Sequence, residues 1–227
     1  SGNCGFSHPM YYHNSYMICD KKSAWVLETA GKEWAAEKVK TIRSISNAIT
    51  IGKHWDKAST NLVSFAIEKG WCKGENDFDF SRCYSEPIYT RFSDAHNRQI
   101  CTSSALSNSG GKITPELMIQ MLRSHSVQRS GKWRPDLGIT GADVCMHSAW
   151  GPIRLSQTAG SLVTHNTEKL STHWVTASAA PCTSIFKPVW LDNGIPETGS
   201  SPTGEFDPRS LFWRHELVHR KIIRDYP

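Results

Sequence analysis

The sequence predicts an α+β fold, in which short antiparallel strands and a few helices follow one another along the chain. Three observations predict it. Residues 12–29 hold two β-favouring runs around a polar turn, residues 114–122 carry helix-start signals before an apolar stripe, and residues 144–191 hold several strand-like runs. With 227 residues and 38% hydrophobic residues, the chain can bury a core and is too apolar to be disordered.

The first part of the chain is predicted to form a small antiparallel sheet. Residues 12–19 are rich in aromatic and β-favouring side chains, residues 20–23 form a polar turn, and residues 24–29 give a second strand. Residues 34–39 are predicted as a third strand. Residues 42–50 mix isoleucines with small polar residues and contain the run SISNAIT, which we expect to be a strand whose end serves chemistry or binding.

Helix signals follow this sheet. An apolar face at helical spacing predicts a helix over residues 56–69, which Gly70 would end. Residues 86–106 are predicted to be helical in part. Thr114 is a good N-cap residue, and Pro115 is suited to the first position of the short helix that follows.

The last third of the chain is predicted to contain strands and one long helix. A Ser/Gly-rich linker at residues 107–112 precedes the Thr114 helix, and no internal repeat or clear domain boundary is visible. Asp207 is expected to cap the last helix, with Pro208 at its first position. The predicted strands are residues 144–147, 160–165, 172–177 and 183–191.

The composition argues against several classes of partner. The net charge of +5 is mild and the basic residues are scattered, so nucleic-acid binding is not expected. No apolar run reaches membrane-spanning length, and no Asn-x-Ser/Thr glycosylation site occurs. The seven cysteines are widely spaced without a Cys-x-x-Cys pair, so we expect no zinc ribbon, mostly buried free thiols and a reducing, cytoplasmic compartment.

One short motif matches a metal-binding pattern. The sequence HELVH at residues 215–219 is an HExxH motif on a predicted helix, where two histidines could bind zinc with Glu216 as general base. The alternative is packing, because the first histidine belongs to an apolar stripe and the second borders it. We expect packing and no metal. The stripe comprises Leu211, His215, Val218 and Ile222.

Several long blocks, in order, resemble the secernin and cysteine-type dipeptidase family, which belongs to the N-terminal nucleophile (Ntn) hydrolases. The resemblance begins with the hairpin and continues almost to the end of the chain. The blocks are SISNAITIG (44–52), FDFSRCYSEPIYTRFSD (78–94), ITPELMIQMLRSHS (113–126), VCMHSAWGPIRLSQTAGSLV (144–163), HWVTASAAPCTSIFKPVW (173–190) and SLFWRHELVHR (210–220).

The resemblance implies that residues 1–227 are the C-terminal two-thirds of a single Ntn-hydrolase domain, an αββα four-layer sandwich. Family members open with a nucleophilic cysteine, and no such opening is present. A separate N-terminal fragment or chain is therefore the expected partner, and dipeptides or related small amides are the expected substrates, with no cofactor required. The alternative is a catalytically inactive scaffold or interaction subunit, and a homo-oligomer also stays open.

The resemblance also implies catalytic roles for Asn47 and Arg91. In Ntn hydrolases the first residue's α-amino group acts as base for its own side chain, and the tetrahedral intermediate then needs oxyanion donors. Asn47 lies where related bile-salt hydrolases place such a donor, and the alternative is an asparagine that bridges strand ends. Arg91 matches an arginine near the nucleophile of distant acylases, where a cation lowers the thiol pKa, and the alternative is a surface arginine.

Arg154 and Gln157 are the predicted substrate-binding residues. They lie in GPIRLSQTAGS, a polar cluster before a predicted strand, and this block is prominent in the family. A guanidinium at Arg154 could pair with a substrate carboxylate through two hydrogen bonds. The alternative is a turn whose polar groups are satisfied locally.

Two other nucleophile candidates are weaker. Cys145 and His147 would share one face of a strand and suggest a Cys/His dyad, but Ntn chemistry uses no histidine base, and such a pair is usually packing. Ser1 would be the nucleophile only if this chain began at an autocleavage site, and the residues after it read as a loop rather than a core strand.

Overall fold

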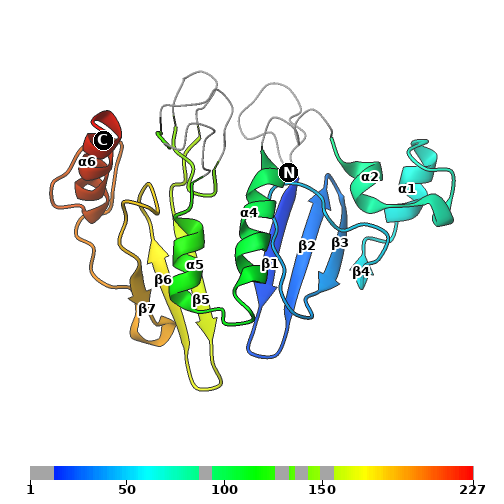
Figure 1. Ribbon diagram of the computed structural model, residues 1–227, viewed down its shortest axis with the longest axis horizontal. Coiled ribbons are helices and arrows are strands. Elements are labelled where there is room, and N and C mark those ends of the chain that lie inside the picture. The colour runs from blue at the N-terminus through cyan, green and yellow to red at the C-terminus, as the bar shows by residue number, and fades with distance from the viewer. Residues whose placement is uncertain (1–12, 87–93, 126–132, 136–142, 149–155, 227) are drawn as a thin grey trace. The chain divides into compact units, whose positions relative to one another are not determined.

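The computed structural model describes residues 13–86, 94–125, 133–135, 143–148 and 156–226. The chain divides into two compact units, Ser1–Asn108 and Ser109–Pro227. The division falls within the Ser/Gly-rich linker, and each unit contains one antiparallel sheet (Figure 1). The α+β class is therefore confirmed, while the four-layer sandwich and the single domain stay predictions.

The sheet of the first unit has the strand order β1-β2-β3-β4, with every neighbouring pair antiparallel. The turn between the first two strands is closed by Asp20, whose carboxylate accepts hydrogen bonds from the backbone nitrogens of Lys22 and Ser23, both at 2.7 Å. The predicted hairpin and third strand are confirmed. The strands are β1 (Asn14–Cys19), β2 (Ala24–Ala30), β3 (Glu33–Lys38) and β4 (Lys57–Ala58).

Helices α1 and α2 of the first unit pack their apolar residues against this sheet. The fully buried centre is formed by Val26, Ile51, Leu62 and Phe80. The predicted helix over residues 56–69 is shorter than expected, because residues 57 and 58 pair with β3 instead. Gly70 follows that helix with a φ of +71°, which favours glycine. The helices are α1 (Leu62–Glu68), the 3-10 turn η1 (Glu75–Asp77), α2 (Phe80–Tyr84) and α4 (Ala95–Asn108).

The prediction of a strand over residues 42–50 was wrong. This segment forms neither helix nor strand, although Ile49 and Ala48 are buried. Side chains of β2 and α4 bind the backbone groups of this segment that would otherwise pair with a neighbouring strand. Strands and irregular buried segments both place an apolar residue every few positions. The sequence pattern alone therefore does not distinguish a strand from an irregular segment here.

The second unit has a three-stranded sheet with the order β5-β6-β7, and α5 packs beside β5. Thr114 caps α5 as predicted, because its hydroxyl accepts a hydrogen bond from the Leu117 backbone nitrogen at 3.3 Å. The predicted strand over residues 144–147 is an irregular segment, and the one over residues 183–191 is reduced to its middle. The elements are α5 (Pro115–Leu122), β5 (Ser161–Asn166), β6 (Ser171–Thr176), β7 (Lys187–Val189), the turn η2 (Leu191–Asn193) and α6 (Leu211–Arg224).

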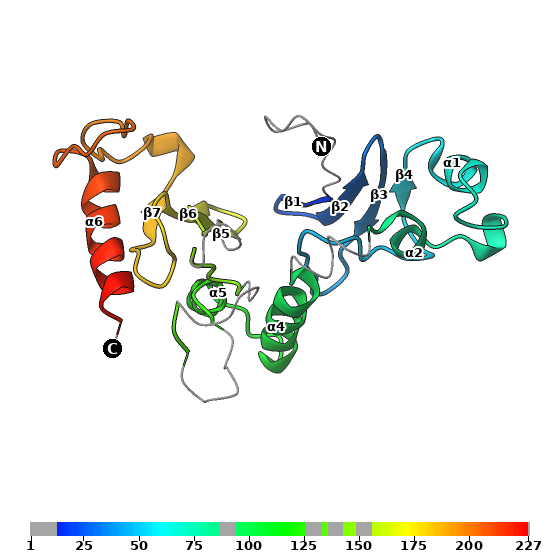
Figure 2. The same ribbon diagram turned by 90° about the horizontal axis from the view of Figure 1, so that it is seen from above.

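Helix α6 begins later than the sequence indicates, and Figure 2 shows it beside β7. Ser210 is its N-cap residue, and Asp207 binds Arg209 through both carboxylate oxygens instead of capping the helix. Its buried residues are Glu216 and His219, so the predicted stripe through Leu211 and His215 is not the face that packs most deeply. Among the described residues, no helix is long and apolar enough to cross a membrane.

Candidate functional site

The segment that carries Asn47 is fixed first by Glu28, a fully buried residue of β2. Its carboxylate accepts hydrogen bonds from the backbone nitrogens of Thr50 and Ile51, at 2.6 and 2.8 Å. Arg43 lies 3.8 Å from the same carboxylate and donates to the Thr50 hydroxyl at 2.7 Å. A buried charge is tolerated only when it is paired in this way, so the residues on both sides of Asn47 are held against the sheet.

Helix α4 holds the segment from the other direction. The Ser44 hydroxyl is 2.5 Å from the Thr102 hydroxyl, and it donates to the Gln99 carbonyl at 3.3 Å. The Gln99 side-chain amide returns a hydrogen bond to the Ser44 carbonyl at 3.1 Å. These bonds explain why an irregular backbone is stable here, since its polar groups find partners on a helix and a sheet.

Asn47 lies half-buried between these two anchors. Its side-chain oxygen accepts a hydrogen bond from the guanidinium of Arg98 on α4 and one from the Ser46 hydroxyl at 3.3 Å. Because both partners bind the oxygen, the orientation of the amide is fixed, and its NH2 group donates to none of the residues that the structure describes. The sequence did not predict a role for Arg98. It lies on α4, the helix that follows the predicted catalytic residue Arg91 along the chain.

The remaining predicted residues are only partly described. Arg91 and Arg154 lie outside the described residues, as does Ser1. Gln157 is half-buried, and its side-chain oxygen accepts a hydrogen bond from Ser148 at 3.4 Å. This contact fits the alternative of a locally satisfied turn, and the substrate-binding role of Gln157 stays a prediction.

The second unit contains a compact group of metal-type donors, the Cys/His cluster, which consists of His125, Cys145, His147 and Cys182. His125 follows the C-terminus of α5, Cys145 and His147 lie on the irregular segment 143–148, and Cys182 lies on the turn before β7. Sequence reasoning considered only the central pair. His125 and Cys182 are far from that pair in sequence and carry no motif spacing, so only folding reveals the set of four.

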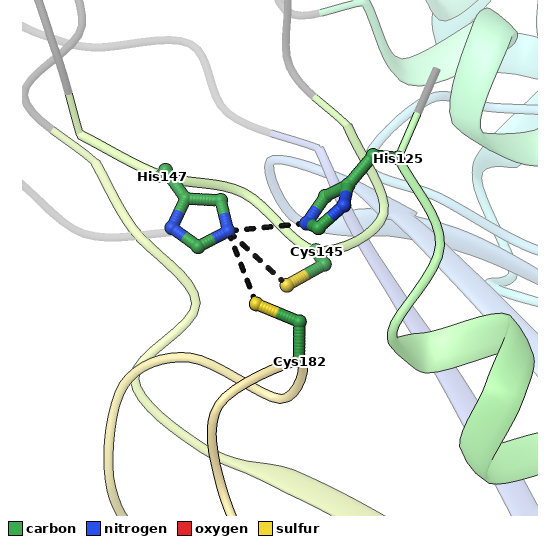
Figure 3. Close-up of side chains that lie close together, drawn as sticks. All are labelled: His125, Cys145, His147 and Cys182. Atoms are coloured by element: carbon green, nitrogen blue, oxygen red, sulfur yellow. Dashed lines mark hydrogen bonds between the residues drawn. The ribbon is translucent and has the colours of Figure 1, made fainter. Parts of the chain in front are cut away.

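The four side chains of the Cys/His cluster point toward a common centre (Figure 3). Their donor atoms all lie within 4.8 Å of one another. His147 Nε2 is 3.1 Å from His125 Nε2, 3.5 Å from Cys145 Sγ and 3.4 Å from Cys182 Sγ. Cys145 and His147 are buried, and His125 and Cys182 are partly exposed.

Hydrogen bonds to backbone carbonyls hold the three segments of the cluster together. The Cys145 backbone nitrogen donates to the Ser124 carbonyl at 3.0 Å, beside His125. The guanidinium of Arg123 donates to the carbonyls of Pro181 and Ser184, at 2.9 and 2.8 Å, on both sides of Cys182. These contacts involve none of the four donor side chains, so they set the positions of the donors independently.

Aromatic side chains cover the cluster. The Trp133 ring stacks on His125 with centroids 3.6 Å apart, and its Nε1 donates to the Asp143 carboxylate at 2.7 Å. His219 of α6 stacks on His147 with centroids 5.7 Å apart. Burial lowers the pKa of His219, so this ring stays neutral at physiological pH. These rings pack on the two histidines of the cluster.

The two thiols of the cluster titrate as a pair. A hydrogen bond with Cys145, and further bonds with the two histidines, lower the pKa of Cys182 to about 3 despite its burial. The hydrogen bond with Cys182, together with burial, raises the pKa of Cys145 above its ordinary value. The lowered pKa favours the thiolate form of Cys182, and a thiolate is the form that attacks electrophiles or binds metals.

The HExxH histidines do not share a site. His215 and Lys187 line a cavity of about 200 Å³, whose other lining residues come mostly from β6, β7, α6 and residues 195–202. His219 packs instead on His147 of the Cys/His cluster. Glu216 is buried and accepts a hydrogen bond from Arg220 at 3.2 Å. Among the described residues, neither histidine belongs to a group of three or more metal-type donors.

Comparisons with known proteins give no independent assignment, since no protein-family model and no solved structure matches the chain. The described residues define an α+β protein with a fixed asparagine amide in one unit and a four-donor Cys/His cluster in the other.

Proposed function

We propose that this chain is part of a cysteine-type Ntn hydrolase that cleaves the amide bonds of dipeptides or related small amides, with the nucleophile outside these residues. The observation that carries the proposal is the fixed amide of Asn47, the residue that the family resemblance selects. Its oxygen is occupied by Arg98 and Ser46, and its NH2 group remains as a donor. An oxyanion donor must be oriented before the reaction, and the fixed amide of Asn47 supports this role.

In the proposed reaction, the α-amino group of the partner's first residue takes the proton from its thiol, and the sulfur attacks the substrate carbonyl. The negative charge that develops on the carbonyl oxygen would be stabilised by the Asn47 amide. Such a donor contributes about 3 kcal/mol to transition-state stabilisation. Arg98 serves as a positioning residue, because its guanidinium contacts Asn47 rather than the reacting atoms.

A second observation supports the proposal that another segment completes the first unit. Strand β1 is an edge of the described sheet, and its Tyr16, Met17 and Ile18 are 49%, 43% and 56% exposed. Trp25, Trp34 and their neighbours line a shallow apolar groove on the same sheet. In a four-layer sandwich a second sheet would cover such a surface.

The proposal is tested by intact-mass analysis of the protein isolated from its natural source. The expected result is a second chain or fragment that begins with cysteine and co-purifies with this one. Dipeptide hydrolysis by that assembly should be abolished by alkylation of the cysteine. An assembly without an N-terminal cysteine and without amidase activity would instead identify the chain as a scaffold subunit.

A further inference from the structure

The three distances from His147 Nε2 to the other donors of the Cys/His cluster are close to those of a tetrahedral zinc site. With Zn–N bonds of about 2.05 Å and Zn–S bonds of about 2.3 Å, a tetrahedron separates two nitrogens by about 3.3 Å and a nitrogen from a sulfur by about 3.6 Å. The corresponding distances from His147 Nε2 are 3.1 Å to His125, and 3.5 and 3.4 Å to Cys145 and Cys182. The donors are therefore already placed around one central position.

Hydrogen bonding among the four side chains does not account for this arrangement. His147 Nε2 has three polar neighbours within 3.5 Å, yet one imidazole nitrogen carries either one hydrogen or one lone pair. His147 Nε2 can therefore make one good hydrogen bond. In its other two contacts, no hydrogen atom can lie on the line between the two heavy atoms. A cation at the centre satisfies all four donors at once, because each directs a lone pair toward it.

The donor types select the metal. Two thiolates and two imidazoles in a tetrahedron are the ligands of zinc, whereas magnesium and calcium prefer oxygen ligands. Two deprotonated cysteines would neutralise the two positive charges of Zn²⁺, so the mostly buried site would carry no net charge. The Cys₂His₂ set leaves no open position, which is typical of a structural site.

We propose that His125, Cys145, His147 and Cys182 bind one structural Zn²⁺ ion. The ion would join the end of α5, the segment 143–148 and the turn that carries Cys182, three parts that Arg123 and Ser124 already hold in position. This site is distinct from the HExxH motif, and it replaces the sequence-based expectation that the chain binds no metal. It does not depend on the proposed hydrolase activity.

The surroundings of the donors fit this role. Metal-binding histidines are usually oriented by contacts with a second layer of residues. Here Trp133 stacks on His125 and is anchored by Asp143, and His219 packs on His147.

The test uses the full chain in the assembly in which it purifies, grown with zinc and dialysed against metal-free buffer. Elemental analysis should give about one zinc per chain, and replacement by Co²⁺ should give the absorption bands of a tetrahedral thiolate site. Cys182→Ser and His125→Ala should lose the metal. Cys19→Ser and His215→Ala, which alter residues outside the cluster, should keep it.

A second pair of variants separates loss of a ligand from loss of the fold. Cys182→His and His125→Cys each retain a donor atom and should still bind zinc, even where the alanine or serine variants are unstable. A parent protein without zinc, a Cys145–Cys182 disulfide in the isolated protein, or zinc that is lost in His215→Ala but kept in Cys182→Ser would each overturn the proposal.

Discussion

The buried carboxylate of Glu28 accepts hydrogen bonds from both the backbone nitrogen and the hydroxyl of Thr50, at 2.6 and 2.5 Å. This pair ties the irregular segment that carries Asn47 to β2, the second strand of the hairpin. The segment has no strand or helix of its own, so its conformation depends on this carboxylate more than on local propensity.

Glu28→Ala should therefore destabilise the protein strongly. It leaves two buried backbone nitrogens without an acceptor and Arg43 without one of its partners, and breaking a buried charge network costs about 3–5 kcal/mol. Chemical denaturation of the purified assembly measures the loss. Glu37→Ala is the matched control, because Glu37 contacts the same arginine but is partly exposed and binds no backbone nitrogen of the segment, and it should cost only a small fraction as much. Equal losses would contradict the role given to Glu28.

His13 should make stability depend on pH. Burial lowers the pKa of His13 from its ordinary value of 6.5, and its Nε2 accepts a hydrogen bond from the Glu86 backbone nitrogen at 3.2 Å. The folded state thus favours the neutral ring. The contribution of His13 to the free energy of unfolding is complete above pH 6.5, its ordinary pKa. This contribution is lost as the pH falls from 6.5 toward the lowered pKa of the folded state.

The measurement for His13 is the melting temperature across about pH 5 to 8. His13→Gln, which can accept a hydrogen bond without titrating, should flatten the decline on the acidic side. The exposed His54 is the control, and His54→Gln should leave the profile unchanged. A parent profile that is flat through this range would contradict the prediction.

If the chain is part of the proposed hydrolase, Asn47→Ala should lower the kcat of the complete assembly by roughly a hundredfold or more, which is the effect of losing one oxyanion donor. Stability should change little, because Asn47 is only half-buried. Asn61→Ala is the control, since the exposed Asn61 makes no capping hydrogen bond through its side chain. A mutant as fast as the parent would remove Asn47 from the catalytic machinery.

Arg123→Lys should loosen the proposed zinc site without removing a ligand. A lysine cannot reproduce the two hydrogen bonds that the guanidinium makes to the carbonyls around Cys182. Zinc should transfer to a chelator about ten- to a hundredfold faster, as is typical when an outer-layer partner is lost. Arg209→Lys, at an exposed arginine that binds Asp207 and contacts none of the cluster residues, should release zinc at the parent rate.

The sequence predicted those parts of the fold whose causes are local. The hairpin follows from alternating β-favouring residues around Asp20, and the start of α5 follows from Thr114. It did not predict the conformation of residues 42–50, because Glu28 and Ser44 stabilise that segment from outside it. The start of α6 was misplaced for a related reason, since the carboxylate expected to cap the helix binds Arg209 instead.

The residues of the candidate sites also fall into two groups: those that the sequence indicated and those that only the tertiary fold reveals. Asn47 was found because it lies in a block that resembles a family, whereas Arg98 contacts it only through the tertiary fold. The Cys145–His147 pair was visible as neighbours in sequence. His125 and Cys182 were not, because tertiary contacts bring them to this pair: the Ser124 carbonyl accepts a hydrogen bond from the Cys145 backbone nitrogen, and Arg123 donates to the Pro181 carbonyl.

The order of the cluster along the chain has a consequence for synthesis. His125 is made first and Cys182 last, so a nascent chain that ends before the turn at Cys182 holds at most three of the four donors. Completion of the cluster must then wait until most of the second unit has left the ribosome. Any ligand that requires all four side chains would stabilise the finished unit by mass action and leave its unfinished precursors untouched.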